Sequence, residues 1–151
     1  MPQTVVRNLT LSLDTSIYAN NDLLADTQEL ADAVKMIDAG AVIQSLTVID
    51  NDDVGQVFDV WILDSNVTFG TENSAPTISD ANAVYIQGRI PVAAADYVDL
   101  GGSKVACIRG LNLPIKPVAG GTSIYVAVTN GTGTPTFTAS GVKLRFGILQ
   151  G

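Results

Sequence analysis

The 151-residue sequence contains no histidine and only one cysteine. Without histidine, catalytic arrangements that use an imidazole base are excluded, and so are zinc sites with histidine ligands. One cysteine cannot form a disulfide within the chain. Cys107 stands in an apolar Val-Ala-Cys-Ile run with no basic cluster beside it. We therefore expect it to be a small buried side chain rather than a reactive thiol.

Basic residues and long apolar runs are scarce as well. Eight lysines and arginines stand against fifteen aspartates and glutamates, which gives a net charge of −7 and a pI near 4.2. A nucleic-acid binder needs a basic face, so no nucleic-acid partner is expected. No apolar run approaches the roughly 18 residues of a membrane-spanning helix, and the N-terminus lacks a signal-peptide pattern. We expect no membrane partner.

Two loops approach known ligand-binding motifs but lack required residues. Asp50–Gly55 matches a calcium loop at its first, third and sixth positions, whereas Val54 and Trp61 stand where oxygen ligands are needed. A solvated turn is the preferred interpretation, with weak calcium binding as the alternative. The segment Gly101–Lys104 lacks the first glycine of a phosphate loop and places its lysine one position late. We expect no metal, no cofactor and no catalytic residues, and so no enzyme.

The residues that are present favour β structure. Apolar and polar residues alternate with a period of two in short runs from Leu9 to Ile148, separated by glycine, asparagine and proline. The expected strands cover residues 4–13, 41–49, 56–63, 84–92, 95–100, 104–108, 111–115, 122–128 and 142–148. Pro91 indicates an edge strand or a bulge, because it cannot donate a ladder hydrogen bond. The pattern predicts an all-β, jelly-roll-like β-sandwich in one domain, residues 1–151, with at most one short helix.

Residues 23–37 are the one ambiguous segment. Leu30, Val34 and Ile37 recur at helical spacing, and the alanine, glutamate and lysine content suits a helix. The part from Thr27 to Val34 also suits a strand with polar residues facing outward. Both interpretations are open from the residues alone.

The stretch from Gly40 to Asp64 predicts a β-hairpin, with Asp50–Gly55 as its turn. Its second strand is apolar on both faces, so it must be covered by the core and also by a second layer or another subunit. We expect one of its faces to be a subunit interface, and the chain to be a homo-oligomer. The candidate interface residues are Phe58, Val60 and Ile62.

Two polar segments are candidates for reaching a partner. Residues 65–83 are rich in asparagine, serine, threonine and glycine, and they form a longer loop than most. Residues 1–6 are a candidate flexible arm. The core predicted above needs neither segment.

Several stretches together resemble a known family, and they occur in this order: Ser16–Leu24, Ile43–Asp50, Val60–Asn66, Ser79–Ala81, Ser123–Val126 and Thr136–Leu149. They are similar to the capsid decoration, or cement, proteins of tailed bacteriophages, which have jelly-roll folds. The resemblance implies a structural protein without catalytic residues that sits on the outer capsid surface of the virion. It implies binding to the major capsid protein lattice, with a trimer favoured and a dimer second, and synthesis in the host cytoplasm. It also favours an extended conformation for Thr27 to Val34.

A β-sandwich carbohydrate-binding module, or a tail or adhesin component, is the alternative to capsid decoration. A sugar-binding groove needs exposed aromatic rings. Aromatic residues make up only 6% of the chain. If Trp61 and the phenylalanines lie in the core, four tyrosines are left for such a groove: Tyr18, Tyr85, Tyr97 and Tyr125.

Overall fold

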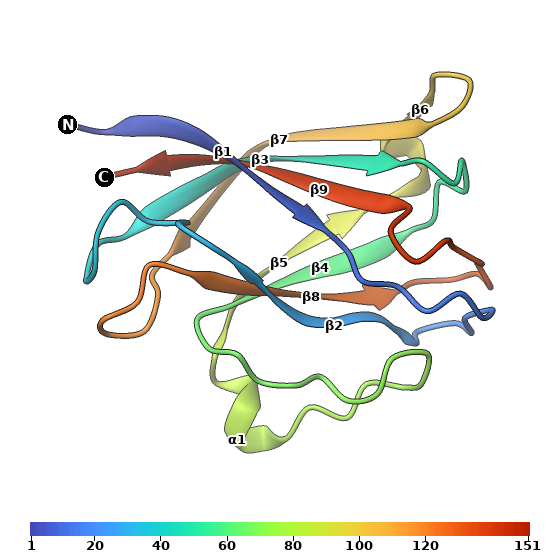
Figure 1. Cartoon of the computed structure of the whole chain (residues 1–151), viewed down its shortest axis with the longest axis horizontal. Coiled ribbons are helices and arrows are strands. Elements are labelled where there is room, and N and C mark those ends of the chain that lie inside the picture. The colour runs from blue at the N-terminus through green and yellow to red at the C-terminus, as the bar shows by residue number, and fades with distance from the viewer.

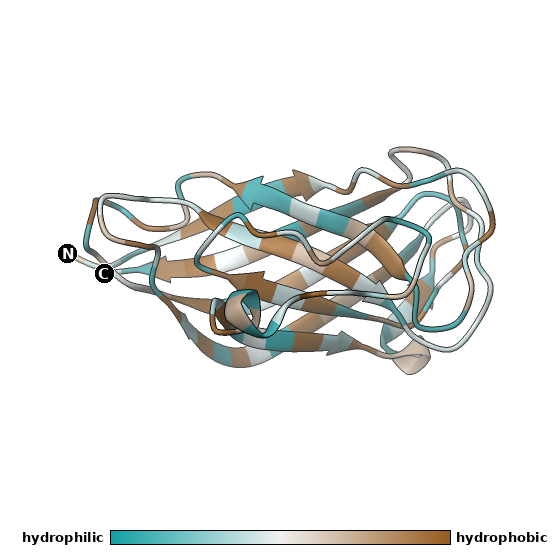
Figure 2. Ribbon diagram, turned by 90° about the horizontal axis from the view of Figure 1, so that it is seen from below, coloured by the Kyte–Doolittle hydropathy of each residue, from teal (hydrophilic) through white to brown (hydrophobic).

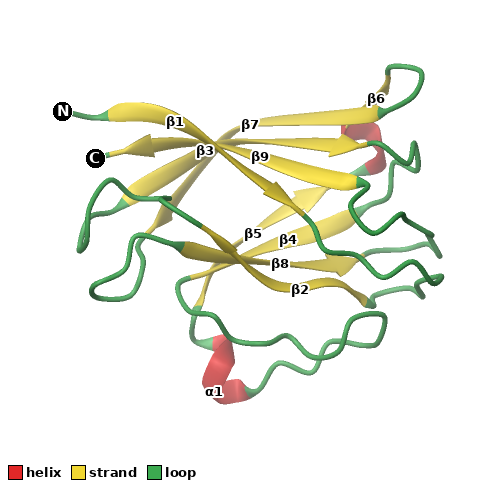
Figure 3. Cartoon of the chain, in the orientation of Figure 1, coloured by secondary structure: helices red, strands yellow, loops and turns green.

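In the computed structural model, which describes residues 1–151, two antiparallel sheets lie face to face (Figures 1 and 3). The strands are β1 (Gln3–Thr10), β2 (Leu23–Leu30), β3 (Ala41–Asp50), β4 (Phe58–Leu63), β5 (Ile86–Val92), β6 (Tyr97–Asp99), β7 (Lys104–Ile115), β8 (Ile124–Asn130) and β9 (Val142–Gln150). One sheet has the order β1-β9-β3-β7-β6, and the other has the order β2-β8-β4-β5. The only helical segments are α1 (Asp80–Ala83) and the 3-10 turn η1 (Ala94–Asp96).

The strands pair in a nested order. β1 pairs with β9, β2 with β8, β3 with β7 and β4 with β5, all antiparallel. Two further ladders, β3 with β9 and β4 with β8, join these pairs into sheets. This is the arrangement of one long hairpin wrapped into a sandwich, which is the jelly roll. The predicted jelly-roll-like sandwich is confirmed, and β6 extends one edge of it.

The core lies between the two sheets and contains 28 buried residues. Because side chains alternate across each strand, every second residue points into it. The apolar residues that alternate along the first and last expected strands are all buried: Leu9, Leu11, Leu13, Val142, Leu144, Phe146 and Ile148. Each buried side chain of this size contributes about 1.5–3 kcal/mol to folding.

Residues 23–37 are a strand followed by turns. The strand β2 ends at Leu30, and residues 31–40 form a loop in which Asp32 and Asp38 have positive φ angles of 55° and 60°. Such left-handed backbone breaks a helix. The helical interpretation is therefore wrong, and the extended one holds only as far as Leu30. Val34 is buried, but it belongs to this loop and not to a strand.

The predicted hairpin between β3 and β4 is also wrong. β3 pairs with β7 and β9, whereas β4 pairs with β5 and β8, so the two strands lie in different sheets. The connecting turn is built on Asp50, which is only 1% exposed. Its carboxylate accepts hydrogen bonds from the backbone N–H groups of Asp52, Val54 and Gly55 at 2.7–2.9 Å. These bonds direct the chain out of one sheet and into the other.

Residues 64–85, which connect β4 to β5, cover the outer face of the four-stranded sheet (Figure 2). Phe69 from this loop is 3% exposed and packs with Leu23 and Leu63. The loop is tied to β2 by backbone hydrogen bonds from Leu23 to Ser74 and from Asn73 to Leu23. The long loop predicted at residues 65–83 is therefore a second layer over the sheet.

Two strands depart locally from their predicted form. β5 carries a bulge where Ile62 pairs with Gly88 but Leu63 pairs with Ile86, so Ile86 packs on the outer face and not in the core. Val84, where the expected strand 84–92 begins, precedes β5 and is 75% exposed. β5 is the edge strand that its proline indicated. The two short strands expected around Gly110 form one strand, β7, with a register shift opposite Ile43 and Ser45.

Candidate functional site

The three candidate interface residues lie inside the sandwich. Phe58, Val60 and Ile62 are 4%, 0% and 0% exposed and belong to the main core. Their register on β4 turns them toward the five-stranded sheet, which covers them. The choice of this face as an interface is therefore corrected, because the chain buries it by itself.

The opposite side of β4 faces residues 64–85, which we call the covering loop. Leu63 is fully buried there, whereas Trp61 is half-buried. The Trp61 indole N–H donates to the Thr129 hydroxyl at 2.9 Å, and its ring lies 6.2 Å from the Phe69 ring. Trp61 is therefore not the core residue expected from its mid-strand position.

A depression of about 340 Å³ opens beside Trp61 at the edge of the covering loop. Its lining is mostly apolar and consists of Asn21, Asp59, Trp61, Phe69, Pro76, Ile78, Ile86, Thr129 and Asn130. The Arg89 guanidinium carbon is 6.0 Å from the Trp61 ring centroid, and its Nε forms an ion pair with Asp59 at 3.0 Å. An aromatic ring beside a carboxylate and an amide can contact an apolar group or a sugar ring.

Tyr85 and Tyr125 are partly exposed and pack with Trp61 on the outer cluster, whereas Tyr18 and Tyr97 serve the structure of the loops. Tyr18 is 1% exposed; its hydroxyl accepts from the Asp14 N–H at 2.7 Å and donates to the Leu24 carbonyl at 2.9 Å. Burial raises the pKa of Tyr18 to about 12. Burial also raises the pKa of Tyr97, whose hydroxyl donates to the Gln56 carbonyl at 2.8 Å. These two residues hold the loops at the ends of the sandwich in place.

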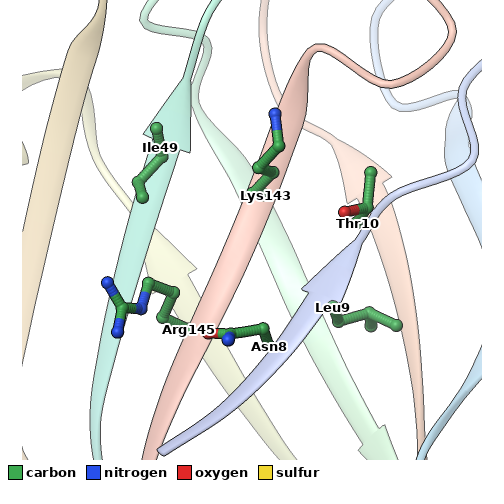
Figure 4. A pocket seen from close by; sticks show the side chains of 6 residues that line it. All are labelled: Asn8, Leu9, Thr10, Ile49, Lys143 and Arg145. Atoms are coloured by element: carbon green, nitrogen blue, oxygen red, sulfur yellow. The ribbon is translucent and has the colours of Figure 1, made fainter.

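The outer face of the five-stranded sheet has no covering loop. Side chains from β1, β9 and β3 lie side by side on it (Figure 4). One shallow depression of about 340 Å³ is lined by Asn8, Leu9, Thr10, Ile49, Lys143 and Arg145. A second, of about 170 Å³, lies at Gly147, where a Cβ atom would come within 2.3 Å of the Ser45 hydroxyl. Arg145 lines both.

Positive charge is concentrated in this sheet. Its five strands contain five of the eight basic residues and two of the fifteen acidic ones, a net charge of +3. The rest of the chain holds three basic and thirteen acidic residues, a net charge of −10. The two acidic residues of the sheet, Asp50 and Asp99, both stand opposite Lys104 in the strand register. Asp50 is buried, and Asp99 is exposed at the edge of the sheet but belongs to the same row as Asp50. Neither carboxylate therefore belongs to the outward row of Ile49, Val105 and Val98 on the uncovered face.

Cys107 lies on this uncovered face and is exposed. The prediction that it is buried was wrong. Cys107 pairs with Thr47 in an outward row, while its neighbour Ala106 is fully buried. An apolar run in a strand divides between the two faces, so membership of the run does not imply burial.

No group of three or more cysteine, aspartate or glutamate side chains is placed to hold a metal ion. In the acidic turn, Asp52 instead accepts hydrogen bonds from the Thr138 N–H and hydroxyl, both at 2.9 Å. Lys104 donates to the Asp53 carbonyl at 3.1 Å. No helix of the chain has the length and apolar character to cross a bilayer.

No protein-family model matches the sequence, and no curated protein matches it. Among solved structures, the chain is similar to a protein of infectious bursal disease virus Gt strain (14% identity, TM-score 0.38), covering 98% of this chain and 31% of that one. It is similar to a chain of desmodium yellow mottle tymovirus (11% identity, TM-score 0.32), covering 99% and 87%. It is also similar to the K3 adhesin domain of Lys-gingipain from Porphyromonas gingivalis W83 (12% identity, TM-score 0.31), covering 86% and 64%. Similarity at this level does not assign a function.

Proposed function

We propose that this protein is a structural component of a virion, which decorates and stabilises a bacteriophage capsid by binding over or between capsid subunits. The observation that carries the proposal is the nested jelly-roll pairing of β1 with β9 through β4 with β5. Viral capsid proteins and lectins use this architecture. Fold alone does not imply function. The resemblance of the sequence to phage decoration proteins is the second support, and it favours the capsid over a lectin role.

The rigidity of the loops supports a scaffold role. Asp26 on β2 holds the covering loop by accepting hydrogen bonds from the Phe69 N–H at 2.8 Å and the Thr68 hydroxyl at 2.7 Å. Buried Asn130 donates to the carbonyls of Ala19 and Gly133 and accepts from Gln56. A clamp between capsid subunits needs such a preorganised shape, because ordering loops on binding would cost affinity.

The partners belong to the same proposal: a homo-oligomer, with a trimer favoured and a dimer second, bound to the major capsid protein lattice. The covering loop removes the surplus apolar face from which self-association was first inferred. Instead, the loop of residues 31–40 and the loop between β7 and β8 lie at the end of the sandwich that holds both termini (Figure 1). The exposed apolar residues of these segments are Met1 (102% exposed), Met36 (58%), Ile37 (57%) and Val118 (45%). The candidate flexible arm at residues 1–6 is corrected, because β1 begins at Gln3 and pairs there with Gln150, which leaves only residues 1 and 2 outside the strand.

Virion association tests the proposal directly. We expect the protein to co-sediment with purified phage particles and to appear as extra density on the outer capsid surface in cryo-electron microscopy. Capsids of phage that lack the gene should break open at a lower temperature, or at a lower salt concentration, than wild-type capsids do. Absence of the protein from purified virions would contradict the proposal, and density confined to the tail would favour a tail component.

The depression beside Trp61 favours one alternative, a carbohydrate-binding module. Trp61, Asp59 and Asn21 offer a ring, a carboxylate and an amide to one ligand. A glycan array followed by calorimetric titration would test this activity. Millimolar or tighter binding that is lost in Trp61→Ala would establish it, and no binding across the array would exclude it.

A further inference from the structure

We propose that the uncovered face of the five-stranded sheet, centred on Arg145, docks against an acidic surface of another protein. The inference rests on the proposed function, in which that protein is the capsid subunit. The inference goes beyond the proposed function by naming the contact surface and the chemistry of the partner.

The face is a continuous surface made of side chains in register. One row crosses all five strands: Thr10, Lys143, Ile49, Val105 and Val98. The next row carries Arg145 between Asn8 and Thr47. Threonine, valine and isoleucine side chains on a pleated surface are stiff, so they lose little conformational freedom on binding. The face is thus suited to contact a second flat protein surface.

None of the charged groups on this face has a carboxylate partner within the chain. The only ion pair of the molecule joins Arg89 to Asp59 on the other sheet. Arg109 and Arg145 are exposed and make no side-chain hydrogen bond, and Lys143 donates only to the neutral Asn51 amide at 2.7 Å. Arginine guanidinium groups bind carboxylates with two parallel hydrogen bonds. Two free guanidinium groups on a face without carboxylates therefore fit a partner that supplies aspartate or glutamate.

The same charges disfavour a second copy of this chain as the occupant. Face-to-face pairing would oppose two positive surfaces. The opposite side of the sandwich is acidic: the four-stranded sheet and residues 64–85 contain six acidic residues and one basic residue. Docking this side onto the basic face would repeat without closing and would build filaments. A nucleic-acid occupant would have to approach a chain whose net charge is −7.

The test compares two charge-reversed variants with the same change in net charge. Arg109→Glu/Arg145→Glu alters the proposed face, and Lys35→Glu/Lys116→Glu alters two exposed lysines outside the sheet. Binding is measured at about 50 mM and about 500 mM salt. The first probe is capsids purified from phage that lack this gene. The second is immobilised poly-L-glutamate, and duplex DNA is the third. Sedimentation of each variant at both salt concentrations reports self-association.

We expect wild type to bind capsids and poly-L-glutamate more tightly at low salt. The Arg109/Arg145 variant should lose at least about tenfold in affinity, and the lysine variant should stay within about twofold of wild type. An equal loss of affinity in both variants, or no loss in the Arg109/Arg145 variant, would contradict the proposal that this face is the docking surface. Binding of wild type to poly-L-glutamate but not to capsids would reject the capsid role and keep the acidic partner. If wild type self-associates in a salt-sensitive way and the first variant does not, the occupant of this face is a second copy of the chain. If wild type binds DNA and the first variant does not, the occupant is nucleic acid. Either result would contradict an acidic protein as the partner.

Discussion

The Trp61 indole N–H donates to the Thr129 hydroxyl at 2.9 Å, which joins β4 to β8 on the outer face of the four-stranded sheet. A fully buried tryptophan costs about 3–5 kcal/mol when replaced by alanine. Because Trp61 is half-buried and not fully buried, we expect Trp61→Ala to cost about 2–3 kcal/mol, and Thr129→Val about 1 kcal/mol. Urea denaturation followed by circular dichroism measures both. A Trp61→Ala midpoint equal to wild type would mean that the covering loop does not depend on this residue.

The buried carboxylate of Asp50 organises the connection between the sheets. In Asp50→Asn, the amide NH₂ would face backbone N–H groups that now donate to the carboxylate. We expect this variant to lose about 2–3 kcal/mol of the free energy of unfolding. The matched control is Asp53→Asn, since Asp53 is exposed and asparagine tolerates its φ angle of 58°. Equal midpoints for the two variants would show that the Asp50 hydrogen bonds do not hold the turn.

Alkaline pH should weaken the fold through its buried tyrosines. The pKa of Tyr18 is raised to about 12, and the pKa of Tyr97 is raised in the same direction. The unfolded chain loses these protons first, near pH 10. Stability from these groups is therefore complete below about pH 10 and declines as pH rises through the folded-state values. Between about pH 8 and 10 these groups should leave the denaturation midpoint unchanged, and from about pH 10 to 11.5 the midpoint should fall more steeply in wild type than in Tyr18→Phe/Tyr97→Phe. Parallel slopes would contradict this assignment.

The covering loop should keep the four-stranded sheet from self-associating. Phe69 is 3% exposed and packs on Leu23 and Leu63. We expect Phe69→Ser to cost about 3 kcal/mol, to raise protease cleavage within residues 64–85 and to produce salt-insensitive oligomers through the exposed sheet. Val84→Ser is the control, because Val84 is 75% exposed and lies in the same loop. Size-exclusion chromatography and limited proteolysis distinguish the two. Loop cleavage at the wild-type rate would show that Phe69 does not anchor it.

Local patterns were sufficient where one strand has one buried face. The alternation of Val142, Leu144, Phe146 and Ile148 predicted β9 with its inward side, and Pro91 predicted an edge strand or a bulge. Local patterns failed where both faces of a strand are apolar, because either face could then be covered by the other sheet. Phe58 and Trp61 are both large and apolar, so the sequence could not show which lies under the other sheet and which lies under a loop. The candidate surface was missed for a related reason. Arg109 lies in β7 whereas Lys143 and Arg145 lie in β9, and only the pairing of both strands with β3 brings the three onto one face.

The sequence by itself determined that the chain forms an all-β sandwich, because it contains many short period-two runs and almost no helical segment, so the apolar face of one sheet can be covered only by another sheet. The alternation of apolar and polar residues along each strand also determined most inward and outward positions. The tertiary structure alone decided that β3 and β4 enter different sheets, since the same aspartate-rich turn closes a hairpin or crosses between layers according to which strands are free to pair. It also decided that one sheet is covered by residues 64–85 while the other is left open. Long-range pairing, as between Gln3 and Gln150, depends on packing energies that no local window of sequence contains.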